Sequence, residues 1–253
     1  MPYTFSHPVI VLPLKRLKSE WFSTTGLVAG SIAPDLPYFV MMDATTNIGH
    51  TWYGAFLVDL PAAFLVALAF HLGIRNLLIK HLPYPLDKKF ANCLSFNFCA
   101  YMQRKWGIIL VSTLIGIWSH LAWDNFASSD GWIYYLQPSF FEQTVTVGSL
   151  EYHVYRLIER IESLAGLGLL GWIILRKRST KLDLPSLPSR KKVFYWASLL
   201  LITGLISLLY VTIDSEEVIF AHMVVVITSA ALASLIVTSA VVGVLSIAEK
   251  QKV

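Results

Sequence analysis

Charged residues are scarce in this chain of 253 residues, where Asp, Glu, Lys and Arg make up 14% and hydrophobic residues 55%. A soluble domain carries roughly 25% charge, so this chain has too little polar surface to cover a water-soluble globule. Cysteine is nearly absent as well, and the spacing of Cys93 and Cys99 matches neither CxxC nor a zinc knuckle. We expect both to be free thiols in a cytosolic segment.

Long apolar stretches fill much of the remaining sequence. A helix needs roughly 20 apolar residues to cross a bilayer, and four stretches meet that length: 54–79, 107–126, 193–213 and 218–248. Two further stretches, 155–175 and 26–42, are shorter or partly amphipathic. The sequence therefore predicts an all-α, polytopic membrane helical bundle of about six hydrophobic segments.

The N-terminal stretch 8–18 is apolar but reaches only about halfway across a bilayer at 1.5 Å per residue. One interpretation is a re-entrant first segment, with His7 near the outer face and 26–38 returning outward. The other is an interfacial amphipathic helix followed by a span. The sequence favours neither.

Basic residues orient the bundle, because Lys and Arg stay on the cytoplasmic side of a membrane. They fill the connections 75–105 and 176–192 and the C-terminal end, whereas 130–151 and 214–217 lean acidic. We expect a cytoplasmic C-terminus, residues 43–53, 127–153 and 214–217 outside, and a location in the cytoplasmic (inner) membrane. The expected divisions are a membrane-embedded domain, 1–175, a basic linker, 176–192, and a two-helix tail, 193–253. The lipid bilayer is the expected partner, and no nucleic acid is.

Ionisable residues inside apolar segments persist mainly where they bind a ligand or pair with one another. His120 and Asp124 are four positions apart near the outer end of one predicted span, so they share a helix face. Asp35 and His50 approach the same membrane face from other segments. Two imidazoles and two carboxylates form a ligand set that suits zinc, with manganese or iron as alternatives.

These residues lie in short motifs that occur in a fixed order. They are Ser6-His7-Pro8, Ala33-Pro34-Asp35, His50-Thr51 and His120-Leu121-Ala122-Trp123-Asp124, followed by Gly131-Trp132. In order and spacing the motifs resemble DUF4184, a family of uncharacterised bacterial membrane proteins related to membrane-bound metal-dependent hydrolases. A more distant likeness is to the zinc-dependent phospholipase C and S1/P1 nuclease family.

The distant likeness implies one metal site formed by Asp35, His50, His120 and Asp124. It also implies that Asp124 turns toward a second metal ion, which His7 would bind as well. That family supplies a further metal through an HxxxE pair, but here His153 is followed four residues later by Leu157. We therefore expect one or two ions. Glu151, His153, Glu159 and Glu162 remain open as replacement ligands.

The resemblance implies a metal-dependent hydrolase, phosphoesterase-like, acting on a lipid-like substrate near the outer face with a metal-activated water. Asp59 is a candidate partner of His50, and Arg156 and Glu162 are candidates near the site or substrate. The alternative is a non-enzymatic transporter or scaffold in which the cluster is a structural metal or proton site. Plainer interpretations also stand: an intrahelical His120–Asp124 hydrogen bond, Asp35 as a helix cap, a solvated His50, and a structural hydrogen bond from Asp59.

Overall fold

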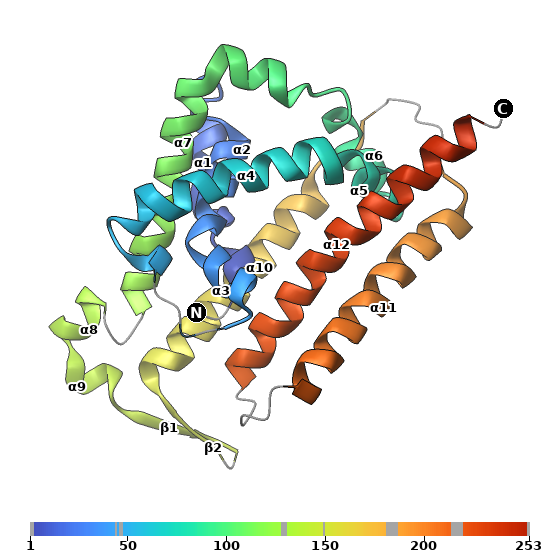
Figure 1. The fold of residues 1–253 in the computed structure, drawn as a ribbon. Coiled ribbons are helices and arrows are strands. Elements are labelled where there is room, and N and C mark those ends of the chain that lie inside the picture. Colours follow the sequence, from blue (N-terminus) through green and yellow to red (C-terminus); the bar gives the residue numbers. More distant parts are fainter. Residues whose placement is uncertain are drawn as a thin grey trace. The chain divides into compact units, whose positions relative to one another are not determined.

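Helices make up nearly all regular structure in the computed structural model, which describes residues 3–43, 45, 48–127, 131–148, 150–180, 187–213 and 220–251 (Figure 1). The α-helices are α1 (Pro8–Leu17), α2 (Thr24–Ile32), α3 (Leu36–Met41), α4 (Leu60–Ala69), α5 (Arg75–His81), α6 (Leu86–Phe90), α7 (Phe98–Ala127), α8 (Trp132–Leu136), α9 (Pro138–Phe141), α10 (Val154–Arg176), α11 (Ser189–Ile213) and α12 (Phe220–Lys250). Short 3-10 or π-helical segments are η1 (Thr4–Ser6), η2 (Ala33–Asp35), η3 (Ile48–His50), η4 (Ala55–Asp59), η5 (Phe70–Ile74) and η6 (Ala91–Cys93). Within the described residues the only strands are β1 (Thr144–Val147) and β2 (Leu150–His153), paired antiparallel.

Four helices are long and apolar enough to cross a membrane: Ala55–His81, Phe98–Phe126, Ser189–Ile213 and His222–Glu249. They correspond to the four long stretches predicted from the sequence, so those predictions and the helical class are confirmed. The stretch 155–175 forms α10, whereas 26–42 is broken into α2, η2 and α3. A count of six segments and a re-entrant first segment stay predictions. The expected outer loop 214–217 and residues 181–186 of the expected linker lie outside the described residues.

The chain divides into two compact units. The first unit combines Met1–Pro37, Thr46–Phe64 and Lys105–Arg176, and the second combines Tyr38–Thr45, Leu65–Arg104 and Lys177–Val253. Every residue proposed as a ligand from the sequence belongs to the first unit. The expected division at 175, 192 and 193 stays a prediction.

Glycines bring α2 and α7 of the first unit into backbone contact. A Cβ atom on Gly30 would lie 2.1 Å from the carbonyl oxygen of Thr113, and one on Gly26 would lie 2.6 Å from that of Ile109. On the facing helix, a Cβ on Gly116 would lie 2.5 Å from the carbonyl oxygen of Leu27. Small residues permit such close approach between apolar helices. The contact fixes α2 against the part of α7 that precedes His120.

The helix that starts at Thr24 is capped and then interrupted. The Ser23 hydroxyl accepts a hydrogen bond from the Gly26 amide, which satisfies one of the free N–H groups of the first turn. Pro34 lacks an amide hydrogen, so the α-helix gives way to the 3-10 turn η2, which ends at Asp35. The interruption places Asp35 in a fully buried turn of the chain.

In the second unit, α11 and α12 pack side by side as a hairpin (Figure 1). The buried Tyr195 side chain lies among Leu199 and Val242, and its hydroxyl group is 2.9 Å from the Ser239 hydroxyl. Trp196 Nε1 donates to the carbonyl oxygen of His81, which ties the hairpin to α5.

Candidate metal centre

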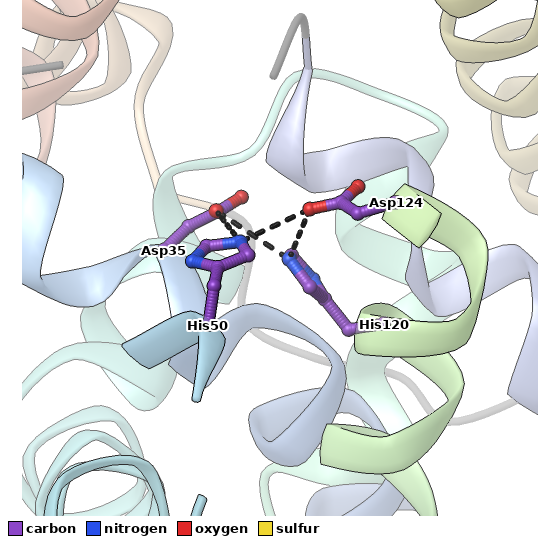
Figure 2. Close-up of side chains that lie close together, drawn as sticks. All are labelled: Asp35, His50, His120 and Asp124. Atoms are coloured by element: carbon purple, nitrogen blue, oxygen red, sulfur yellow. Dashed lines mark hydrogen bonds and ion pairs between the residues drawn. The ribbon is translucent and has the colours of Figure 1, made fainter. Parts of the chain in front are cut away.

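Four side chains from three separate stretches meet inside the first unit (Figure 2). His120 and Asp124 project from successive turns of α7, Asp35 comes from η2, and His50 ends the short turn η3. One ligand atom from each of the four residues lies within 4.8 Å of all the others. The convergence expected from the sequence is therefore present in the structure.

The imidazole nitrogens and carboxylate oxygens alternate around a common centre. His50 Nε2 lies 3.0 Å from Asp124 Oδ2 and 3.4 Å from Asp35 Oδ1. His120 Nε2 lies 3.1 Å from Asp124 Oδ2 and 3.4 Å from Asp35 Oδ1. Each nitrogen thus faces both carboxylates, so the contact between His120 and Asp124 is one edge of a larger cluster rather than an isolated intrahelical pair.

A backbone carbonyl group determines the tautomer of His120. His120 Nδ1 lies 2.8 Å from the carbonyl oxygen of Ser31. A carbonyl only accepts, so Nδ1 is the N–H donor, and in the neutral imidazole the lone pair is on Nε2. Among the described residues, Nε2 makes no hydrogen bond, although it is buried and close to two carboxylates. Carboxylate oxygens repel a nitrogen lone pair that faces them. The arrangement is stable only if a cation lies between Nε2 and the oxygens, or if Nε2 itself carries a proton.

Asp35 is held by its other oxygen. Thr4 Oγ1 donates a hydrogen bond of 2.5 Å to Asp35 Oδ2, and this leaves Oδ1 turned toward the two histidines. Asp35 is completely buried, and Oδ1 has no hydrogen-bond partner among the described residues. An ionised carboxylate in such a place needs a compensating positive charge. The helix-capping interpretation of Asp35 therefore does not account for the oxygen that faces the cluster.

His50 reaches the cluster because of a glycine before it. A Cβ on Gly49 would lie 2.3 Å from the carbonyl oxygen of Pro34, so η3 packs directly on the turn that carries Asp35. Burial disfavours a charged His50, but the hydrogen bond to Asp124 and the negative charges of Asp124 and Asp35 outweigh burial and raise the pKa of His50 to about 9. The two carboxylates thus create a negative potential at the position that a cation would occupy.

The four side chains of the cluster could hold a metal ion. Zinc binds imidazole nitrogen and carboxylate oxygen at about 2.0–2.2 Å, so neighbouring ligand atoms of a tetrahedral site are about 3.3 Å apart. The four nitrogen–oxygen separations, 3.0, 3.1, 3.4 and 3.4 Å, are close to that value, and all the ligand atoms lie within 4.8 Å of one another. His50 and Asp124 are 19% and 20% exposed, whereas Asp35 and His120 are fully buried, so the cluster opens to the surface on one side.

His7 lies beside the cluster as an additional imidazole. Its ring stacks on His120 with the centroids 3.9 Å apart, and its Nε2 is 3.5 Å from Asp124 Oδ1, the oxygen that does not face His50. Burial, aided by the nearby His120, lowers the pKa of His7 to about 4. Asp124 therefore lies between the four-residue cluster and a neutral, buried imidazole.

The three outer candidates differ in their relation to the site. Asp59 is fully buried at the end of η4, and neither of its oxygens has a hydrogen-bond partner among the described residues, contrary to the structural hydrogen bond expected. Its Oδ1 would be 2.9 Å from a Cβ on Gly49, so Asp59 lies against the turn that carries His50. Glu162, half-buried on α10, interacts electrostatically with Asp124. Arg156 is exposed and donates to the hydroxyl group of its neighbour Tyr155.

Sequence reasoning missed the residues that orient the ligands. Thr4 and the Ser31 carbonyl have no motif of their own, because a hydroxyl or a backbone oxygen can serve any neighbour. The close contact of α2 could have been predicted from its glycines. Gly26 and Gly30 form a GxxxG pattern, which is typical of close helix contacts in membranes.

A family model described as "Domain of unknown function (DUF4184)" matches residues 1–244. No curated protein and no solved structure matches the chain. The match covers the site and all four membrane-capable helices up to the last turns of α12.

Proposed function

Because the chain belongs to the DUF4184 family, whose function is unknown, we propose from its own residues that it is a membrane-bound metal-dependent hydrolase. The observation that carries the proposal is the convergence of Asp35, His50, His120 and Asp124 within 4.8 Å, with the His120 lone pair turned toward two carboxylates. Zinc is the proposed ion, with manganese or iron as alternatives. The proposed number of ions is one or two. The second ion, where present, lies between His7 and Asp124.

The proposed reaction is hydrolysis of a phosphoester in a lipid-like substrate. A bound zinc ion would supply an activated water and polarise a phosphoryl oxygen. The water oxygen bonds to phosphorus, the bond from phosphorus to the leaving alcohol oxygen breaks, and the water proton ends on that alcohol. The protein side chains hold the ion, and the exposed edges of His50 and Asp124 give the substrate its approach.

The proposed setting is a bacterial cytoplasmic membrane crossed by about six segments, with the C-terminus in the cytoplasm and the site near the outer face. The four membrane-capable helices support membrane insertion. Two of them carry site residues, since Asp59 lies in Ala55–His81 and both His120 and Asp124 lie in Phe98–Phe126.

A metal measurement tests the site directly. Protein purified in detergent should contain about one or two equivalents of a divalent metal by elemental analysis. The double variant His120→Ala/Asp124→Ala should lose it, because two of the ligands disappear, while His222→Ala should retain it, because His222 contacts Tyr210 outside the cluster. Full retention by the double variant would reject the ligand set.

A second candidate function is a structural metal or proton site in a non-enzymatic transporter or scaffold. The complete burial of Asp35 and His120 favours it, and a zinc ion with four protein ligands is usually structural. Two protonated imidazoles could also balance the two carboxylates without a metal.

Hydrolysis assays separate these candidates. Metal-loaded protein in mixed micelles should release phosphate or a phosphorylated headgroup from phosphoester lipids, and chelation should abolish the release. Retention of a stoichiometric metal without turnover of any phosphoester or carboxylester substrate would favour the structural role.

A further inference from the structure

The segment formed by residues 131–148 and 150–153, the post-α7 segment, leaves large apolar side chains uncovered directly after the helix that carries His120 and Asp124. It comprises α8, α9 and the β1–β2 hairpin, which follow the lower end of α7 in Figure 1. The exposed fractions are 58% for Trp132, 70% for Tyr135, 67% for Leu136 and 47% for Phe140. A loop in water would not be expected to present four such residues within nine positions.

Charge is almost missing from the same segment. Between Gly131 and Val147 the only charged residue is Glu142, and its Oε1 accepts a hydrogen bond of 2.7 Å from the Tyr134 hydroxyl. The loop charges predicted an acid-leaning outer loop for this part of the chain. Its described structure instead combines exposed aromatic side chains with few charges to solvate them.

The exposed side chains are held in place by a small core of their own. Tyr134 packs on Phe141 and Tyr155, with ring centroids 6.1 and 5.9 Å apart. The Trp132 amide donates to Asn125 Oδ1, so α8 is tied to the last turn of α7 beside Asp124. The exposure therefore belongs to a folded element.

We propose that the post-α7 segment lies in the headgroup layer of the bilayer that α7 crosses, with Trp132, Tyr135, Leu136 and Phe140 as its membrane contacts. The proposal rests on the membrane insertion in the proposed function and is independent of the hydrolytic chemistry. Continuity supports it, because the segment begins at Gly131 and the membrane-capable stretch of α7 ends at Phe126. Trp and Tyr are enriched at this depth of a membrane, where an apolar ring and a polar edge are both satisfied.

Two arginines at the start of α10 provide positive charge that could contact the headgroup layer. The Arg160 guanidinium stacks 4.7 Å from the Tyr152 ring centroid, and that of Arg156 stacks 5.8 Å from the Tyr155 ring centroid. A guanidinium group can form charge-assisted hydrogen bonds with a lipid phosphate, so aromatic rings and guanidinium groups fit the same amphiphilic surface. A headgroup at this depth would lie close to the exposed edge of Asp124, which precedes the anchoring Asn125.

Depth measurement by spin labelling tests the proposal. Nitroxide labels are placed singly at Tyr135 and Phe140 in a Cys93→Ser/Cys99→Ser background, in nanodiscs that hold one chain each. Labels at Ser95, in an expected cytosolic loop, and at Leu205, on the 25-residue apolar helix α11, give the aqueous and hydrocarbon references. The labels at 135 and 140 should collide with dissolved oxygen more often, and with a water-soluble nickel chelate at least several-fold less often, than the Ser95 label.

Nickel accessibility at 135 and 140 equal to that at Ser95 would overturn the proposal, because the segment would then be in water. Labels shielded from both oxygen and nickel would overturn it as well, because protein would then cover the surface. Neither outcome depends on metal binding. Metal content measured on the same labelled protein therefore separates a failure of this proposal from a failure of the proposed function.

Discussion

Two contacts outside the cluster orient the side chains of His120 and Asp35. The Ser31 carbonyl fixes the tautomer of His120, and Thr4 holds one oxygen of Asp35 so that the other faces inward. Such partners of metal ligands typically change metal affinity by 10- to 100-fold when removed. The four side chains and the groups that orient them are therefore arranged together in the folded chain.

Replacement of Thr4 by Val should weaken metal binding by roughly 10- to 100-fold without unfolding the protein. The buried Asp35 Oδ2 loses its donor, and the carboxylate is free to rotate away from the histidines. Titration against a chromogenic chelator measures the affinity. Thr4→Ser, which keeps the hydroxyl group, should bind metal like the unchanged protein, and equal affinity for Thr4→Val would remove Thr4 from the site.

At this scale the sequence predicted the convergence of Asp35, His50, His120 and Asp124 and failed on the groups that orient them. His120 with Asp124 is a spacing that a helix converts into proximity, and Asp35 next to Pro34 marks a break in an apolar stretch. Asp59 was interpreted as a structural hydrogen-bond donor or acceptor, yet its oxygens have no such partner among the described residues. Contacts from a hydroxyl or a backbone carbonyl depend on the folded chain, and no local pattern encodes them.

At the scale of elements, the site depends on how closely α2 approaches α7. The carbonyl of Ser31 reaches His120 only because Gly26, Gly30 and Gly116 let the two backbones touch. Apolar length alone predicted one short span over 26–42, but Pro34 divides it, and the close approach is encoded in the GxxxG pattern instead. The apolar length of a stretch predicts that a helix forms. The distance between α2 and α7 depends instead on glycines, which have no side chain.

Replacement of Gly30 by Ala should lower the free energy of unfolding by about 1–3 kcal/mol and reduce metal content in parallel. The new methyl group would lie 2.1 Å from the Thr113 carbonyl oxygen, a backbone atom that cannot move alone. Thermal unfolding in detergent and elemental analysis provide the two readouts. Gly107→Ala, on α7 with nothing within 4 Å of the added carbon, is the matched control and should lower neither the stability nor the metal content. Equal stability for both variants would contradict the close contact.

For the whole molecule, the membrane-capable helices were the most predictable part. Apolar length is a property of local composition, so the positions of the four membrane-capable helices follow from the sequence alone. The way the chain divides into units was much less accessible, because residues 38–45 and 65–104 cluster with the C-terminal part. Such grouping depends on contacts between distant segments.

The predicted topology places the turn that bears His50 and the post-α7 segment on one side of the membrane. Single cysteines at Tyr53 and Gln143, in the Cys93→Ser/Cys99→Ser background, should react with an impermeant maleimide on intact cells. Cysteines at Ser95 and Gln251 should react only after permeabilisation, because basic connections stay inside. Reaction at Tyr53 only after permeabilisation would contradict the assigned orientation.

The distribution of the four ligands along the chain has a consequence for biogenesis. Ribosomes add roughly 5–20 residues per second, so Asp35 and His50 leave the ribosome several seconds before His120 and Asp124 exist. During that interval the carboxylate of Asp35 lacks the imidazole of α7 and cannot stably enter a water-free interior. We therefore expect the early segments to stay near water until α7 is inserted or to carry Asp35 in its protonated form. In the proposed metal-binding form, capture of the ion would then join the segments of the first half.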